Sequence, residues 1–198
     1  MLAPMSATDT ALSIALGVGL AAAVGFRVFL PLLIASIGAY TGHLQLHDSF
    51  AWLGSIYAVI MLAVAATAEV LAYYIPAVDN LLDSITTPLA LVAGACVTAA
   101  VITDLPPMIR WSTAIIAGGG VAAITQGVTT LVRAKSTTFT AGLGNPVIST
   151  VELLAAGSIA LIALIAPLVA VALVIAFCWL VVYVVRRFLR SDNAAKQS

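Results

Sequence analysis

The chain has 198 residues, of which 63% are hydrophobic and only 8% are charged. Soluble domains carry about 25% charged residues, so this composition excludes an ordinary soluble protein and indicates an integral membrane protein. The formal net charge is zero, so no overall field favours nucleic acid, and the two cysteines, Cys96 and Cys178, have neither a metal-binding nor a disulfide spacing.

Six apolar runs along the chain predict six membrane-spanning helices in a single all-α domain. A helix needs about 20 apolar residues to cross the hydrocarbon, where unpaired backbone groups are not tolerated. The last two spans share one apolar run, which we divide at Ala166 and Pro167 because proline ends a helix. The predicted spans cover residues 11–37, 51–75, 88–103, 109–132, 147–165 and 168–187, and residues 188–198 form a polar tail.

The positions of the basic residues predict how these spans are oriented. One basic cluster follows the fourth span and another follows the sixth, so six spans put both clusters on the same side. The positive-inside rule makes that side the cytoplasm, and we expect both termini there. Three helices in each half would give the two halves inverted topologies, as in many transporters. The basic residues concerned are Arg133, Lys135, Arg186, Arg187, Arg190 and Lys196.

The first span contains a charged residue near its middle, Arg27. A charge at this depth costs at least about 2.5 kcal/mol on insertion scales and needs a partner or a water-filled cavity. Gly25 and Pro31 allow the helix to kink, because proline removes the hydrogen bond to the Arg27 carbonyl. Helical side chains lean toward the N-terminus of their helix, so we expect Arg27 to reach the cytoplasmic side and pair with Glu69 or Glu152.

Three other polar residues lie inside the predicted spans at similar depth. Glu69 belongs to the second span, Gln126 to the fourth, and Glu152 to the second turn of the fifth. Together with Arg27 they predict a polar cluster that faces the cytoplasm. Two interpretations stay open: an ion pair that only fixes helix packing, and a site through which an anion or a proton passes.

The segment before the fifth span has features that are typical of an anion-binding helix start. Two glycines permit an irregular backbone, an asparagine suits the N-cap, and a proline suits the first helical position. Backbone amides, hydroxyls and two cations then surround a helix N-terminus, where phosphate or carboxylate often binds. A well-capped helix explains the same residues without a ligand. The residues concerned are Arg133, Lys135, Gly142, Gly144, Asn145 and Pro146.

The remaining polar segments predict no enzyme, metal site or cofactor. Asp79 and Asp83 follow Pro76 and lie one turn apart, which favours a short interfacial helix whose acids pair with the basic loop. His43 and His47 are four residues apart but offer too few ligands for a metal. The sequence contains no Ser-His-Asp, Cys-His or HExxH constellation.

Three stretches resemble a bacterial membrane protein family, domain of unknown function 4126. They are GLAAAVGFRVFLPLL, EVLAYYIPAVDNLLD and STTFTAGLGNPVISTVE, and the resemblance runs from about Gly17 to Glu152 and beyond. It implies a compact polytopic membrane protein but no substrate or activity. The matching residues are Arg27, Pro31, Glu69, Pro76, Asp79, Asp83, Gly144, Asn145, Pro146 and Glu152. The chain departs from the family pattern, which has ionisable groups there, at Tyr73, Tyr74, Gln126 and Thr129.

We therefore expect a small transporter or flippase in the bacterial inner membrane. Its substrate would be an anionic solute bound by Arg27 and its cluster, or a phosphorylated lipid head group held by the loop from Arg133 to Pro146. The alternative is a non-transporting scaffold or partner subunit whose buried charges only fix packing; an enzyme acting on lipid ranks third. Expected partners are membrane lipid and a second copy of the chain, bound through faces of small residues.

Overall fold

The computed structural model describes the backbone of residues 7–75 and 78–195, and the side chains of that range except residues 79, 80 and 184–195. The predicted residues Pro76 and Lys196 therefore lie outside the described residues. So do the side chains of Asp79, Arg186, Arg187 and Arg190.

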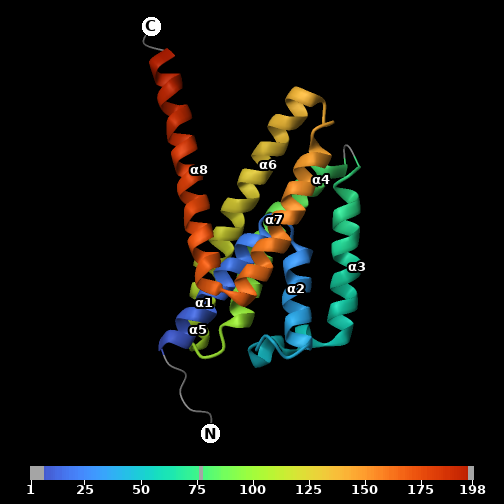
Figure 1. Cartoon of the computed structure of the whole chain (residues 1–198), viewed down its shortest axis with the longest axis vertical. Coiled ribbons are helices and arrows are strands. Elements are labelled where there is room, and N and C mark those ends of the chain that lie inside the picture. The colour runs from blue at the N-terminus through green and yellow to red at the C-terminus, as the bar shows by residue number, and fades with distance from the viewer. Residues whose placement is uncertain (1–6, 76–77, 196–198) are drawn as a thin grey trace.

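All regular structure in the described residues is helical (Figure 1), which confirms the expected all-α class. The element η1 is a 3-10 helix and η2 is a π-helical turn. In chain order the elements are α1 (Ala7–Val24), α2 (Phe29–Tyr40), η1 (Asp48–Gly54), α3 (Ile56–Ala72), α4 (Val78–Val101), α5 (Pro107–Thr113), η2 (Ala114–Gly119), α6 (Gly120–Thr140), α7 (Asn145–Ile165) and α8 (Pro167–Ala195).

The apolar helices make the chain a multi-pass membrane protein. Over the described residues, 4 stretches are long and apolar enough to cross a membrane by themselves: α1, most of α4, the run from α5 to α6, and α7. The pair η1 and α3 is bent by 67° and would bring the number to 5. Helix α2 and the described part of α8 are shorter apolar helices.

The first predicted span, residues 11–37, does not form one continuous helix. The structure divides it at residues 25–28 into α1 and α2, which run in opposite directions as a helical hairpin (Figure 1). Leu12 and Leu16 of α1 line the same cavity, of about 480 Å³, as His43 and Leu44 beyond α2. The hairpin therefore returns to the end of the molecule from which α1 begins.

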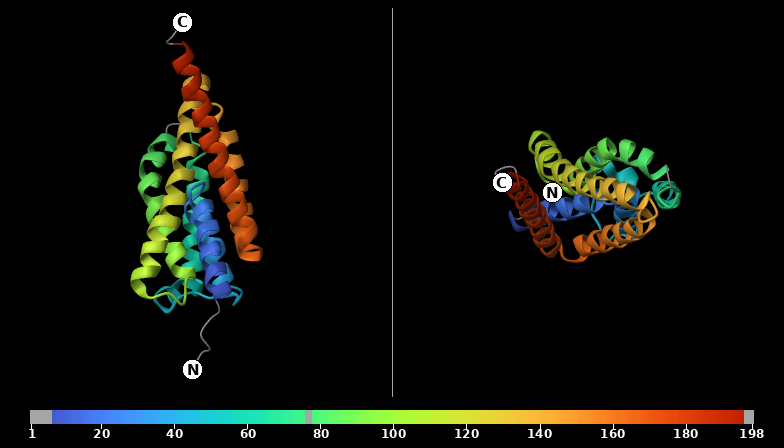
Figure 2. Two further views of the ribbon diagram at one scale, coloured as in Figure 1. Left: turned by 90° about the vertical axis from the view of Figure 1, so that its left-hand side faces the viewer. Right: turned by 90° about the horizontal axis from the view of Figure 1, so that it is seen from above.

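This hairpin changes the predicted placement of the N-terminus. From α3 onward, α3, α4, the run from α5 to α6, α7 and α8 alternate in direction (Figures 1 and 2). Ala7 consequently lies at the end that carries the loop of His43, and Ala195 lies at the end of the loop between α6 and α7. The prediction had placed both termini at the latter end, because it counted the first run as one full crossing.

Several predicted boundaries also differ. Helix α4 begins at Val78 and continues through Pro88, so the acidic segment belongs to a long helix and not to a separate interfacial one. The fourth span lengthens to residues 107–140, because the turn η2 keeps α5 and α6 continuous. The corner between α7 and α8, in contrast, lies at Ala166, as predicted. Helix α8 extends to Ala195, into the predicted polar tail.

Helix α1 lies at the centre of the bundle and packs against α4, α6, α7 and α8 (Figure 2). Small residues make this close approach possible, as is common between membrane helices. A Cβ atom added to Gly19 would lie 2.8 Å from the Cβ of Ala170 and 2.9 Å from that of Ala163. The fully buried side chains of Leu20 and Val24 continue this core up to the tip of the hairpin.

Candidate functional site

The tip of the α1–α2 hairpin is held in place by a glycine and a proline. A Cβ on Gly25 would lie 2.5 Å from the Cβ of Thr125 and 2.6 Å from the carbonyl oxygen of Ala122, so only glycine fits against α6 here. Pro31 lies in the first turn of α2, where a missing amide hydrogen leaves no bond unmade. These residues therefore separate two helices and do not kink one. The predicted helical lean of Arg27 is wrong, because its backbone is not helical.

Glu69, near the end of α3, caps the start of α2. The amides of Val28 and Phe29 donate to its two carboxylate oxygens at 2.8 and 3.0 Å. The first amides of a helix lack partners within the helix, and a negative charge is stabilised at that end. Glu69 thus binds the backbone beside Arg27, and the ion-pair partner of Arg27 is the other predicted candidate, Glu152.

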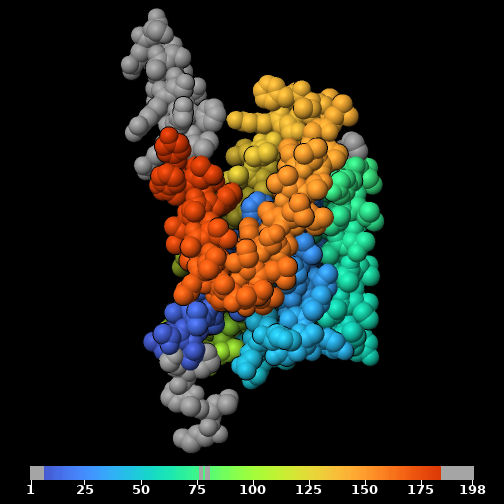
Figure 3. Space-filling model, in the orientation of Figure 1, coloured from blue at the N-terminus to red at the C-terminus, as the bar shows by residue number. Residues whose placement is uncertain are grey.

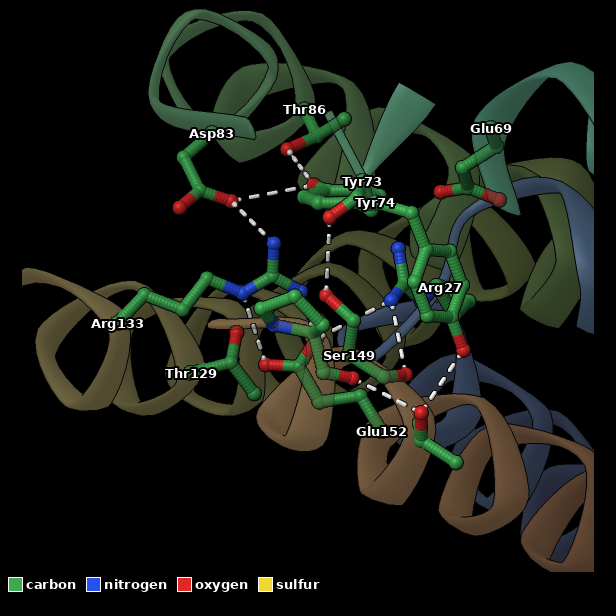
Figure 4. Close-up of polar contacts among 12 residues, drawn as sticks. Arg27, Glu69, Tyr73, Tyr74, Asp83, Thr86, Thr129, Arg133, Ser149 and Glu152 are labelled. Atoms are coloured by element: carbon green, nitrogen blue, oxygen red, sulfur yellow. Dashed lines mark hydrogen bonds and ion pairs between the residues drawn. The ribbon is translucent and has the colours of Figure 1, made fainter. Parts of the chain in front are cut away.

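Arg27 and Arg133 share the carboxylate of Glu152 (Figure 4). Nη2 of Arg27 lies 3.6 Å from Oε2 of Glu152 and donates to the carbonyl oxygen of Ser149 at 2.9 Å. Arg133 contacts the same Oε2 through Nη2, and its Nε donates to Oε1 at 3.1 Å. Its Nη1 also lies 3.7 Å from Oδ1 of Asp83, so four charged groups form one ion network.

The ring of Tyr73 joins the two arginines. The Cζ atoms of Arg27 and Arg133 both lie 3.9 Å from the ring centroid, so the two cations are within about 8 Å of each other. The electron-rich ring face stabilises a cation on it. The Tyr73 hydroxyl donates to Oδ1 of Asp83 at 3.1 Å and lies 3.1 Å from Oγ1 of Thr86 (Figure 4).

Neutral side chains extend the ion network across the bundle. Nε2 of Gln126 donates to Oγ1 of Thr86 at 3.1 Å, and Oγ1 of Thr129 donates to the Gln126 carbonyl at 2.9 Å. The Ser149 hydroxyl donates to the carbonyl of Tyr73 at 3.4 Å. The connected groups come from α4, α6, α7, the hairpin tip and Tyr73, the residue that follows α3, and we call this set the tip network.

The charges of the tip network are buried but not all of them are satisfied. Arg27 is 1% exposed, Arg133 2%, Glu152 4% and Asp83 6%, so two buried cations face two buried acids of the network, and a third buried acid, Glu69, lies beside them. Buried donors are almost always hydrogen-bonded, because an unpaired one loses its hydration without compensation. Yet Nε and Nη1 of Arg27 have no hydrogen-bond partner among the described residues. These two nitrogens are donors that the described residues leave unpaired.

The predicted anion-binding loop is arranged differently. Gly144 occupies the N-cap position and Asn145 is the first residue of α7, followed by Pro146 in the first turn. Nδ2 of Asn145 donates to Oγ1 of Thr137 at 3.0 Å. The turn itself uses left-handed conformations at residues 141 and 142, with φ of 51° and 86°. Gly142 is the only glycine of this turn with a positive φ, a conformation that glycine adopts without steric cost.

The loop amides and cations do not converge on one site. The amide of Gly144 donates to Oγ1 of Thr140 at 3.0 Å, and that of Asn145 to the Gly142 carbonyl at 3.1 Å, so these two amides are already bonded. Arg133 points into the tip network, whereas Lys135 lies exposed beside α8. The structure therefore brings Arg133 to the predicted cluster and leaves Lys135 and Asn145 out of it.

Sequence reasoning missed several members of the tip network. Asp83 was expected to pair with a cation of the basic loop, and the structure provides that pair with Arg133, but it was not assigned to the site. Tyr73 was interpreted only as the loss of an ionisable group. It lies about one helical turn after Glu69 in the sequence, and this spacing was the signal that could have placed it near the site. Thr86 and Ser149 carried no signal, because lone hydroxyls are common in membrane helices.

Comparison with known proteins identifies the family. The search of curated proteins and the search of solved structures found no significant match. The family model described as "Domain of unknown function (DUF4126)" matches residues 14–187, a range that contains every residue of the tip network. This match covers most of the chain and confirms the resemblance carried by the three sequence stretches. The protein belongs to the DUF4126 family.

Proposed function

We propose that this protein moves an anionic group across the membrane, as a transporter of a small anionic solute or a flippase for a phosphorylated lipid head group. The observation that carries the proposal is Arg27. It is 1% exposed, lies in a non-helical break, and has two nitrogen donors without a hydrogen-bond partner among the described residues. Buried arginine donors are usually satisfied by the protein, so the two unpaired nitrogens of Arg27 support the binding of an anion.

The helix break supports transport for a second reason. Non-helical backbone at membrane depth is tolerated only where protein buries it or where it lines a water-filled cavity. Transporters use such broken helices to bind substrate near the middle of the bilayer. Residues 25–28 form a break of this kind between two apolar helices, and Glu69 supplies the missing partners of the first amides of α2.

The arrangement of charges suggests how an anion would bind and leave. A guanidinium can donate two parallel hydrogen bonds to a carboxylate or phosphate along its Nε–Nη2 edge or its Nη1–Nη2 edge, and an anion on Arg27 would use one such edge, which contains one unpaired nitrogen. An anion on that edge would weaken the 3.6 Å contact between Arg27 and Glu152. Glu152 would remain compensated by Arg133, so binding would leave no acid without a counter-ion. Return of Glu152 to Arg27 would release the anion.

We place the end of the molecule with the α6–α7 loop in the cytoplasm, because Arg133, Lys135 and the basic residues after Tyr183 follow the positive-inside rule. On this proposal the N-terminus lies outside the cytoplasm. The membrane would be a bacterial inner membrane, as the resemblance implied, and a dimer would form through faces of small residues.

The test is reconstitution of the purified full chain into vesicles. One arm follows the release of entrapped inorganic phosphate, and the other follows the movement of tail-labelled fluorescent phosphatidylglycerol between leaflets. We expect at least one probe to move faster than in protein-free vesicles. Arg27→Met should slow that probe at least about tenfold, since it removes charge-assisted hydrogen bonds to the anion. Arg27→Lys, which keeps the charge, controls for a general loss of the fold.

Two results would overturn the proposal. The first is that neither probe moves faster with the wild-type protein than without it. The second is that Arg27→Met folds and moves the probe at the wild-type rate.

The second candidate is the non-transporting scaffold. The balanced charges of the tip network favour it, because four side chains compensate one another without a ligand. It predicts that the Arg27→Met and Glu152→Gln double variant keeps full function in cells. Transport predicts that the double variant folds and is inactive.

A further inference from the structure

An apolar groove runs between α6 and α8 and encloses about 340 Å³. Its residues on α6 follow one another at three- and four-residue spacing, so they form one face of that helix. Those on α8 do the same, and the two faces lie opposite each other. Apart from one lysine at the end nearest the α6–α7 loop, the groove is lined by apolar side chains: Val128, Leu131, Val132, Phe177, Leu180 and Val181. The lysine is Lys135.

The groove reaches the tip of the hairpin. The ring of Phe177 contacts that of Phe26, with centroids 5.8 Å apart, and Phe26 directly precedes Arg27. In Figure 3, blue atoms of the hairpin are visible between α7 and α8. The Phe26–Phe177 contact therefore joins the lining of the groove to the residue next to Arg27.

Two exposed aromatic residues on α8 indicate where the charged end of the groove lies relative to the membrane. Trp179 and Tyr183 stack on each other on α8, with ring centroids 5.6 Å apart, and are 66% and 49% exposed. Exposed tryptophan and tyrosine are enriched at the membrane–water interface. Lys135 lines the same end of the groove, so its side chain would lie near lipid phosphates while the apolar residues contact an acyl chain.

We propose that the groove binds one anionic phospholipid, with an acyl chain along α6 and α8 and the phosphate at Lys135. This inference rests on the proposed function and sharpens it, because it selects lipid over a free solute as the source of the anion. A soluble anion needs no apolar groove. Lys135 would provide the selectivity, since an uncharged groove would accept any lipid of the bilayer equally.

The experiment measures binding and not transport. The full chain is placed in phosphatidylcholine bilayers with a trace of phosphatidylglycerol that carries a photoreactive diazirine in its acyl chain, and the labelled peptides are mapped. A parallel sample carries the same diazirine on phosphatidylcholine. We expect residues 128–135 and 177–181 to be labelled about fivefold more by the anionic probe, which corresponds to one lysine near the head groups.

Three variants make the assignment specific. Lys135→Ala should lose the fivefold preference, and Lys135→Arg should keep it. Val132→Trp should block labelling of the groove by both probes, because it fills the space. Leu154→Trp is the matched control: both positions are membrane-facing, 46% and 65% exposed, but Leu154 lies on α7 away from the groove. It should leave the labelling unchanged.

Equal labelling by the two probes would overturn the inference, because it would mean that the groove binds lipid without selecting an anionic head group. Labelling that spares the groove, or that survives Val132→Trp, would overturn it as well. Since labelling needs no movement across the bilayer, its failure is distinct from failure of the transport assay. A selective groove in a protein that moves neither probe would refute only the proposed function.

Discussion

The two ends of the α1–α2 hairpin contrast in charge and burial. At the tip, Arg27 and Glu152 are 1% and 4% exposed and belong to an ion network. At the base, Asp9 and His43 are exposed beside the cavity of about 480 Å³. Between the two ends lie the apolar side chains of Leu20, at 0%, and other core residues of α1. One short hairpin thus connects an open cavity at its base to a buried ion network at its tip through an apolar segment.

This contrast shows where the path between the two ends of the hairpin is closed. A polar ligand at the base cannot reach Arg27 without displacing Leu20 and Val24, which are fully buried. A protein that moves anions must open such a segment in another state, and a hairpin whose tip is a non-helical break has fewer backbone bonds to break than a continuous helix. The predictions below separate the energetic roles of the two ends.

The largest effect is expected for Glu152→Gln. It removes the carboxylate that both arginines share, and leaving a buried charge without its partner costs about 3–5 kcal/mol of unfolding free energy. Unfolding of the detergent-solubilised protein by sodium dodecyl sulfate measures this. The matched change at the base, Asp9→Asn, should alter stability by no more than about 0.5 kcal/mol, as exposed substitutions do. Equal losses at both ends would contradict the contrast.

Next in size is the energetic coupling between Arg27 and Glu152. Because the two side chains are in contact, Arg27→Met combined with Glu152→Gln should be less destabilising than the sum of the single changes, by about 0.5–3 kcal/mol. Arg133 keeps Asp83 as a partner in the double variant, so part of the network survives. Strict additivity in the same unfolding assay would mean that the 3.6 Å contact contributes nothing to stability.

A smaller and more local effect is expected for Glu69→Gln. Gln offers one acceptor oxygen where the carboxylate offers two, so one of the amides of Val28 and Phe29 loses its partner. Loss of a cap costs about 0.5–2 kcal/mol. Hydrogen exchange should accelerate at these two amides, while the amides of α7 stay unchanged. Unaltered exchange at residues 28 and 29 would show that Glu69 does not hold the start of α2.

The polar members of the site could be predicted because polar side chains stand out in apolar runs. Arg27, Glu69, Gln126 and Glu152 each interrupt a predicted span, and the structure places Glu69 against the break and the other three in the tip network. The choice between Glu69 and Glu152 as the partner of Arg27 could not be made from sequence. The first amides of α2 bind the carboxylate of Glu69, which leaves Glu152 as the partner of Arg27. The sequence did not predict that a helix begins there.

The hairpin itself was hidden for a physical reason. Both of its arms are apolar throughout, because both are surrounded by protein or lipid, so hydropathy contains no sign that the chain reverses at Gly25. That reversal depends on the close approach of Gly25 to α6, a contact between segments far apart in sequence. Tyr73 was hidden likewise: its role depends on two arginines that meet it only in the folded bundle.

The smallest effect should follow removal of the Tyr73 hydroxyl. In Tyr73→Phe the ring still stabilises Arg27 and Arg133, and only the hydrogen bonds to Asp83 and Thr86 are lost, at a cost of about 0.5–1.5 kcal/mol. Tyr73→Leu also removes the cation–π contacts and should cost about 0.5–2 kcal/mol more. Tyr40→Phe, at an exposed position at the base, is the control and should be neutral. If Phe and Leu at position 73 were equally stable in the unfolding assay, the two arginines would be held by their acids alone, and the ring would only fill space between them.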